Sequence, residues 1–125
     1  MTVLTLELPD ELSSRIEPMR SWLPTILELS LLGLRTPAVV TATEIVEFLS
    51  GDPSQQEVMN YAVTERGQAR LQRLLALNDS ELLSMDEEHE LDELAKIERI
   101  MVMLKAQVAA TLQHGKSTLA AKGRQ

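Results

Sequence analysis

The fold of this chain is decided by the stretch MDEEHELDELAKIERIMVMLKAQVAATLQ, which runs from Met85 to Gln113. Large apolar residues recur along it at 3-4-3-4 spacing, on Leu94, Ile97, Met101, Leu104 and Val108. Ser84 and Glu87 form the pattern of a capping box, and the acidic first turn suits the positive end of a helix. The pattern predicts one helix with an apolar stripe, roughly 40 Å long at 1.5 Å per residue.

The apolar stripe and the acidic residues before it allow two interpretations. The stripe can bind a partner protein, while the acidic residues face a basic partner surface and speed encounter. It can instead pack on other helices of this chain. We predict the first role, for Leu94, Ile97, Met101, Leu104 and Val108 together with Asp86, Glu87 and Glu90.

At the other end of the chain, residues 2–8 alternate in a pattern typical of a half-buried strand. A lone strand leaves its backbone groups unpaired along both edges. The simplest remedy is the same strand from a second copy, so we predict a homodimer with an antiparallel two-stranded ribbon. A strand paired with a toxin, or left exposed, is the alternative. The residues that we expect to hold the dimer are Leu4, Leu6 and Leu8 of the strand, with Leu27 and Leu31.

The rest of the chain has the pattern of successive helices. Proline and glycine positions and capping patterns predict helices over residues 9–17, 24–33, 41–50 and 53–77, with a break near Thr64 left open. The predicted fold is therefore mainly α, with one short N-terminal strand, several helices and a long last helix. We divide the chain into a strand-helix-helix dimerisation region (1–35), a helical middle region (36–78), the long partner-binding helix (79–114) and a disordered basic tail (115–125).

Composition narrows the function classes. The 125 residues include no cysteine, which excludes disulfides, thiolate metal sites and cysteine nucleophiles. One Trp, one Tyr and one Phe leave few stacking platforms for single-stranded nucleic acid and few linings for a small-molecule pocket. The most apolar stretch, Leu23 to Leu34, is shorter than the roughly 20 residues of a membrane span, and the N-terminus lacks a secretory-signal pattern. We expect a cytoplasmic protein with no membrane partner.

The net charge of −7 is unevenly distributed. Residues 79–99 form an acidic block, and residues 100–125 contain basic but no acidic side chains. The overall negative electrostatic potential repels DNA and favours binding to a basic partner surface. Arg66, Arg70 and Arg73 form a stripe on one helix face, and with Thr5 they are the candidate contacts to nucleic acid; a solvated helix face is the alternative.

The residue patterns do not predict catalysis. His89 and Glu93 share a helix face, but they supply only two of the three or four ligands that a metal site requires. The glycines are isolated, so the chain has no phosphate-binding loop. We expect no catalytic residues, no metal site, no cofactor and no enzyme activity.

Two stretches resemble known families. LTLELPDEL, Leu4 to Leu12, resembles the start of ribbon-helix-helix antitoxins, which begin with a short strand ending in Leu-Pro and continue into an acidic helix start. LDELAKIERIMVMLKAQ, Leu91 to Gln107, resembles the closing helix of small uncharacterised cyanobacterial proteins of toxin–antitoxin-like gene pairs. The resemblance implies an N-terminal dimerising region and a C-terminal region that wraps a nuclease toxin.

The DNA-reading positions depart from the ribbon-helix-helix pattern. The outward strand residues would be Val3, Thr5 and Glu7, and only Thr5 is suited to a base edge. We therefore expect weak or absent DNA binding. The function that the sequence predicts is an antitoxin-like protein that neutralises a nuclease by protein–protein contacts. A scaffold or assembly factor, or a transcriptional regulator without a toxin, is the alternative.

Overall fold

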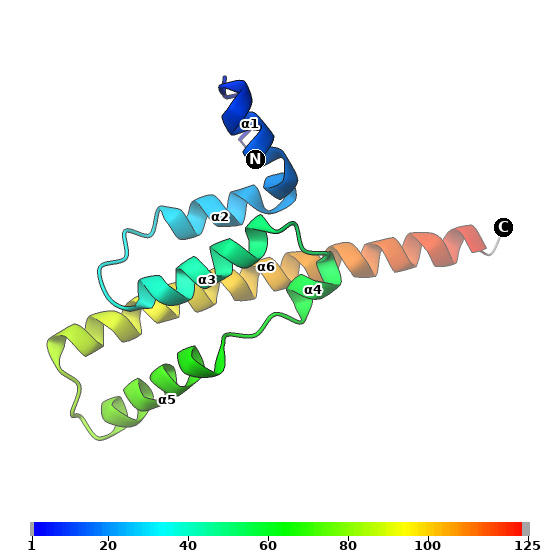
Figure 1. The fold of residues 1–125 in the computed structure, drawn as a ribbon. Coiled ribbons are helices and arrows are strands. Elements are labelled where there is room, and N and C mark those ends of the chain that lie inside the picture. Colours follow the sequence, from blue (N-terminus) through cyan, green and yellow to red (C-terminus); the bar gives the residue numbers. More distant parts are fainter. Residues whose placement is uncertain (1, 124–125) are drawn as a thin grey trace.

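The computed structural model describes residues 2–123 of the chain, with side chains as far as His114. It is mainly helical, as the sequence predicted, and its helices lie around the long last one (Figure 1). The elements are α1 (Asp10–Ile16), the 3-10 helix η1 (Glu17–Trp22), α2 (Leu23–Ser30), α3 (Ala38–Ser50), α4 (Gln55–Met59), α5 (Glu65–Asp79) and α6 (Met85–Gly123).

The core forms where α2, α3 and α4 pack against one face of α6. Ile45 and Leu49 of α3 and Val58 of α4 are fully buried there. Each element alone presents an apolar face that water would otherwise contact, so α6 supplies the surface that covers them. The residues of this cluster are Trp22, Ile26, Leu29, Ala38, Ala42, Ile45, Leu49, Val58, Ile97, Met101, Leu104 and Val108.

Two polar contacts fix how the loops join this core. The Trp22 indole Nε1 donates a hydrogen bond to the Pro53 carbonyl oxygen at 2.9 Å, which ties η1 to the segment before α4. The Glu93 carboxylate of α6 accepts hydrogen bonds from the Arg35 and Thr36 backbone N–H groups, at 3.0 and 3.1 Å, and from the Thr36 hydroxyl at 2.6 Å. Because these donors lie just before α3, Glu93 holds the start of α3 against α6.

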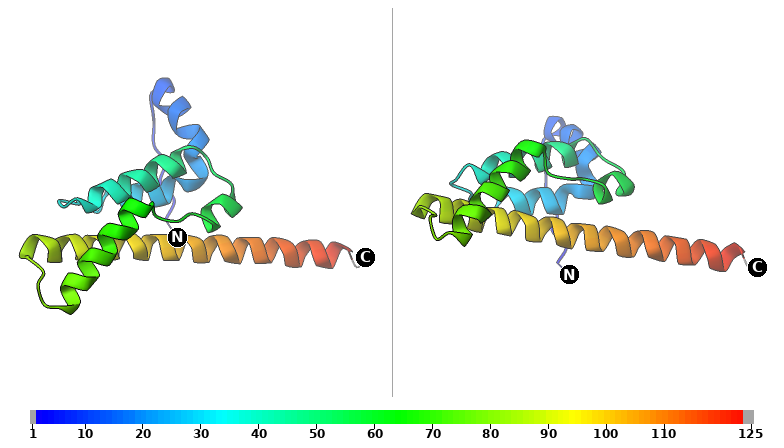
Figure 2. Two further views of the ribbon diagram at one scale, coloured as in Figure 1. Left: turned by 60° about the horizontal axis from the view of Figure 1, so that its bottom comes forward. Right: turned by 90° about the horizontal axis from the view of Figure 1, so that it is seen from below.

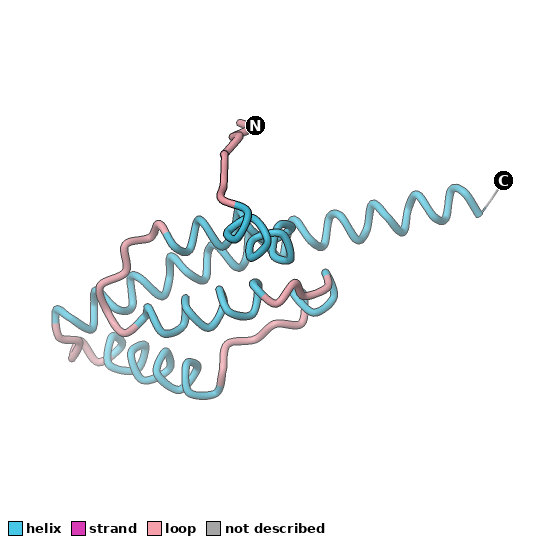
Figure 3. Tube along the Cα trace, turned by 45° about the horizontal axis from the view of Figure 1, so that its top comes forward, coloured by secondary structure: helices cyan, strands magenta, loops and turns pink. Residues whose placement is uncertain are grey.

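The predicted N-terminal strand is wrong. Residues 2–9 have no regular secondary structure, and no strand occurs anywhere in residues 2–123 (Figure 3). Leu4, Leu6 and Leu8, which were expected to form one buried face, are exposed. Alternating leucines form a strand only when a neighbouring strand pairs with them, and residues 2–123 contain none. The two-stranded ribbon that was predicted from it is therefore corrected as well.

Two helix boundaries also differ from the prediction. The helix α3 begins at Ala38, not at the capping pattern of Thr41 and Glu44, and the Ala38 backbone N–H donates to the Thr36 hydroxyl at 3.2 Å. The backbone of α6 continues to Gly123 through most of the segment expected to be disordered. That segment contains no proline, so only the modest cost of Gly115 opposes continuation. Positions 124 and 125 of the predicted tail lie outside the described residues.

We predict that Leu49→Ala lowers the free energy of unfolding by about 2–5 kcal/mol, since it leaves a cavity in place of a fully buried side chain. Leu82→Ala is the matched control, because Leu82 is exposed in the turn before α6 and should change stability by less than about 0.5 kcal/mol. Urea unfolding followed by circular dichroism measures both. Equal losses in the two variants would contradict the placement of the core.

Candidate functional site

The stripe that was predicted to bind a partner is buried inside this protein. Ile97, Met101, Leu104 and Val108 belong to the core, and Leu94 is half-buried beside them. A partner cannot reach these side chains while the helices remain packed. The assignment of the stripe to a partner is therefore corrected. The stripe packs on other helices of the same chain, which is the alternative that the sequence left open.

Glu90 and Arg70 also have a different role from the predicted one. The Arg70 guanidinium of α5 donates through Nε and one terminal nitrogen to the two Glu90 carboxylate oxygens, both at 2.8 Å. The Glu90 side chain is 4% exposed and that of Arg70 is 40% exposed. The hydrogen bond to Glu90 raises the pKa of Arg70 above its ordinary value, although partial burial opposes the rise. Glu90 is therefore buried away from any partner, and the part-exposed Arg70 is engaged by it, so the pair fastens α5 to α6.

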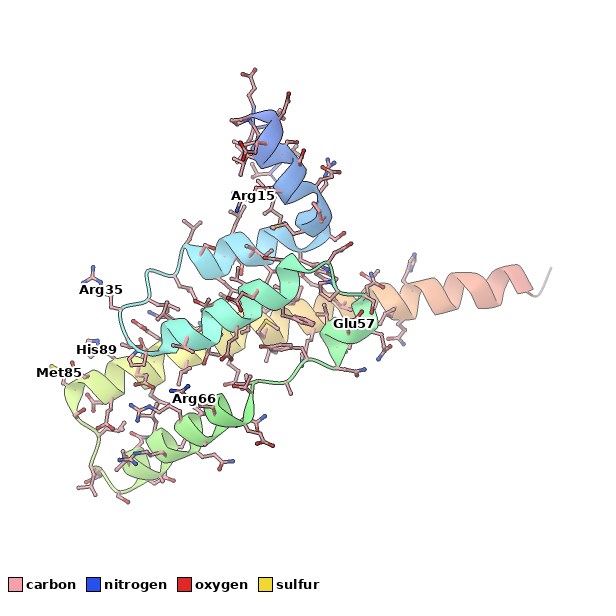
Figure 4. All side chains as sticks on the ribbon, in the orientation of Figure 1. Arg15, Arg35, Glu57, Arg66, Met85 and His89 are labelled. Atoms are coloured by element: carbon pink, nitrogen blue, oxygen red, sulfur yellow. The ribbon has the colours of Figure 1, made fainter. Side chains whose placement is uncertain are left out.

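Of the other predicted residues here, Arg66, Arg73 and Asp86 are exposed and Glu87 is half-buried. Arg66 is among the side chains labelled in Figure 4. Glu87 caps its own helix, since its backbone N–H and carboxylate contact the Ser84 hydroxyl and backbone N–H. These bonds, with the charges of Arg70 and Arg73, lower the pKa of Glu87. Arginines and carboxylates therefore lie together here, so the surface is no purely basic track for phosphates.

The structure gathers no metal-binding set among the described residues. No group of three or more His, Cys, Asp or Glu side chains that could hold a metal ion occurs there. Glu93, which the sequence placed on one helix face with His89, directs its carboxylate to Arg35 and Thr36. Burial would raise the pKa of Glu93, but the hydrogen bonds from Thr36 and Arg35 outweigh it and lower the pKa below its ordinary value.

An apolar groove of about 380 Å³ lies between α3, α5 and α6. Its lining is mainly aliphatic, and the Lys105 ammonium at its side already donates to the Tyr61 carbonyl oxygen at 2.6 Å. Its other charged lining residue is Glu98. Thr41 and Tyr61 add hydroxyl groups to this lining, and no histidine is among its residues.

The N-terminal segment, residues 2–16, is the candidate functional site. None of the seven residues of α1 is buried, and this helix extends away from the body of the molecule (Figure 1). An isolated helix of this length is marginal in water, so contacts outside the helix are needed to hold it. The large aliphatic residues exposed in the segment are Val3, Leu4, Leu6, Leu8 and Leu12.

All charged side chains in the first part of this segment are negative. Glu7, Asp10 and Glu11 are acidic, and the first basic residue is Arg15. Leu4, Leu6 and Leu8 of this segment were predicted to be interface residues, but in a two-stranded ribbon. Leu27 and Leu31, the other predicted dimer residues, are exposed on and just after α2. A dimer through these residues stays a prediction.

Comparison with protein-family models, with curated proteins and with solved structures finds no match for this chain. Within its described part, the structure contains no helix with both the length and the apolar character needed to cross a membrane. The arguments about function therefore depend on the geometry and chemistry of these surfaces.

We predict that Arg70→Ala lowers the free energy of unfolding by about 2–3 kcal/mol, because it leaves the Glu90 carboxylate buried without a partner. The value lies below the range for fully buried pairs, since water reaches the guanidinium. Arg70→Met combined with Glu90→Met should recover most of the loss. Arg66→Ala on the same helix is the control and should change little. A double variant no more stable than Arg70→Ala would argue against the pair.

We predict that Glu93→Gln lowers stability by about 1–2 kcal/mol at pH 7, because the amide replaces a charged acceptor of the Arg35 and Thr36 donors. Because the carboxyl pKa is lowered on folding, the ionised Glu93 stabilises the fold at pH values above its pKa in the unfolded chain, about 4.3. This stabilisation is lost as the pH falls through the pKa in the folded protein. The difference in free energy of unfolding between the variant and the unchanged protein should therefore decrease in acid. Urea unfolding at pH 7, 5 and 3 measures it, with Glu88→Gln as the exposed control. A pH-independent difference would contradict this role.

Proposed function

We propose that this chain is a non-enzymatic protein that acts by binding another protein through residues 2–16. The observation that carries the proposal is that this segment exposes five large aliphatic side chains while α1 buries none of its residues. Scattered exposed leucines are common, but a consecutive segment of them next to an unsupported helix indicates a surface that a partner covers.

The gain and the cost of such a contact are of similar size. Full burial of one leucine or valine side chain contributes about 1.5–3 kcal/mol. Ordering the backbone of residues 2–9 and the side chains opposes this gain by about 1–2 kcal/mol per residue. We therefore expect that the partner must cover most of the segment before binding becomes stable, as in other cases of folding coupled to binding.

The charge of the segment indicates the chemistry of the partner. An acidic partner surface would repel Glu7, Asp10 and Glu11, and a purely apolar one would desolvate them. Basic side chains at the rim of the partner's surface would compensate these negative charges. A nuclease has such side chains because it must bind the phosphate backbone of its substrate. The specific form of the proposal is therefore an antitoxin-like protein that neutralises a nuclease. A scaffold or assembly role uses the same segment with a different partner.

Binding of nucleic acid is at most a weak addition to this proposal. The net charge of −7 opposes the approach of DNA, and Arg70 is engaged by Glu90. Thr5 lies in a segment without strand structure, so the base contact expected from a ribbon has no support. We expect any residual affinity to disappear at moderate salt.

The test is calorimetric titration of the full chain with the protein encoded by the adjacent gene. We expect Leu4→Ser, Leu6→Ser and Leu8→Ser together to weaken binding at least 100-fold, since three apolar contacts are lost, while the unfolding transition stays unchanged because these residues are exposed. Leu75→Ser with Leu82→Ser is the matched control, because both residues are exposed elsewhere.

Three results would count against the proposal. Undiminished binding by the triple variant would refute the assignment of residues 2–16. Equal loss in the control would indicate a non-specific apolar contact. Binding without inhibition of any RNA or DNA cleavage by the adjacent protein would refute the antitoxin form and leave the scaffold form.

A further inference from the structure

The apolar groove beside α6 exists because the two helices that flank it diverge. Both α3 and α5 pack on α6, but they contact each other only marginally. Figure 2 shows that α5 crosses α6 at a much larger angle than α3 does. The groove of about 380 Å³ lies between these helices.

Two polar contacts hold the walls of the groove in place. The Thr64 hydroxyl, just before α5, donates to a Glu44 carboxylate oxygen of α3 at 3.3 Å. The Lys105 ammonium of α6 donates to the Tyr61 carbonyl oxygen at 2.6 Å. The groove is therefore formed before any ligand enters it, as small-molecule sites usually are.

The lining of the groove suits a flexible alkyl chain. Tyr61 is the one aromatic residue among the described residues that line it, so a ligand ring has little to stack on. The volume has room for on the order of ten methylene-sized groups, at roughly 30 Å³ each. Among the aliphatic side chains that would contact such a chain are Ile45, Leu71, Leu94, Ile97 and Val102.

One cation lies beside these aliphatic side chains. Lys105 is half-buried, and the hydrogen bond to Tyr61 uses one of its three ammonium N–H groups. None of the ion pairs that the described residues form involves Lys105. A partly desolvated ammonium group without a carboxylate partner favours an anion beside it.

The other charged residue of the lining, Glu98, does not supply this anion. Its side chain is exposed, and its carboxylate forms no ion pair with Lys105. Water screens an exposed carboxylate more strongly than a half-buried ammonium group. The groove therefore favours an anionic ligand head over a cationic one.

We propose that this groove binds a free medium-chain alkyl carboxylate, with its chain among the aliphatic side chains and its carboxylate beside the Lys105 ammonium. A remaining N–H group of Lys105 donates a charge-assisted hydrogen bond to a carboxylate oxygen. The site shares no residue with the segment 2–16, so it goes beyond the proposed function and is tested independently of it.

Calorimetric titration of the full chain with octanoate at pH 7 tests the site. We expect a dissociation constant on the order of 100 µM. 1-Octanol and octylamine should each bind at least fivefold more weakly, because neither offers an anion to Lys105. From hexanoate to decanoate, each added methylene should strengthen binding about fourfold, until the chain fills the groove.

Two adjacent residues of α6 provide matched variants. Val102 and Met103 are each 58% exposed, but only Val102 lines the groove. Val102→Asp should weaken octanoate binding at least tenfold, because it adds a carboxylate to the lining. Met103→Asp should leave binding unchanged. Any change in the unfolding transition should be the same for both variants, since both side chains are exposed.

The variant Lys105→Met tests the head group, because it keeps an apolar stem and removes the ammonium. It should weaken octanoate binding at least tenfold and leave 1-octanol binding unchanged, which also shows that the groove persists. Lys96→Met is the control, since Lys96 lies on the same helix, pairs with Asp92 and does not line the groove.

Four results would overturn the inference. They are no binding of octanoate at millimolar concentration, tighter binding of octylamine than of octanoate, equal loss of binding in Val102→Asp and Met103→Asp, and undiminished octanoate binding by Lys105→Met. A failure of the variants in residues 2–16 to affect the protein partner would leave this site untouched, so the two proposals fail separately.

Discussion

The structure depends on the burial of one stripe of α6. Ile97, Met101, Leu104 and Val108 form the surface of α6 that contacts the buried sides of α2, α3 and α4. None of these three helices exceeds thirteen residues, and helices so short are marginal in water without tertiary contacts. Because each of them relies on the same stripe, their positions are coupled through α6, and a defect in the middle of α6 would loosen all three.

Two carboxylates add directional contacts to this apolar packing. Glu90 and Glu93 lie within one turn of α6, and their side chains bind opposite neighbours: Glu90 binds Arg70 of α5, and Glu93 binds the backbone before α3. Apolar contacts allow helices to slide by small amounts, whereas a two-point guanidinium–carboxylate contact fixes both angle and distance. The first turns of α6 thus position the helices that its later turns bury.

The sequence predicted the helical class and the long last helix because both follow from local patterns. The spacing of Leu94 to Val108 and the capping box at Ser84 act within one helix, and the structure confirms the helix and the cap. What covers the stripe was not predictable, since the partner of an apolar face is a property of tertiary packing. The Arg70–Glu90 pair was missed for the same reason: its members are twenty residues apart and meet only because α5 folds back on α6.

The candidate site was predicted only in part. The leucines at positions 4, 6 and 8 were identified as interface residues, but the strand assigned to them is absent from the described chain. Alternation at period two identifies residues that would share a face in a strand, and it says nothing about whether a neighbouring strand exists. Their exposure, and that of α1, could be established only from the packing of the rest of the chain.

The position of α6 after the helices that it covers has a consequence for synthesis of the protein. A ribosome releases residues in order, so α1 to α5 emerge before the stripe that covers them exists. The apolar sides of α2, α3 and α4 must remain uncovered until α6 has emerged, and exposed apolar surface of this kind promotes aggregation and attracts chaperones. The nascent chain therefore cannot fold element by element from its N-terminus, and a transcript truncated before Leu94 would encode a protein with no core to form.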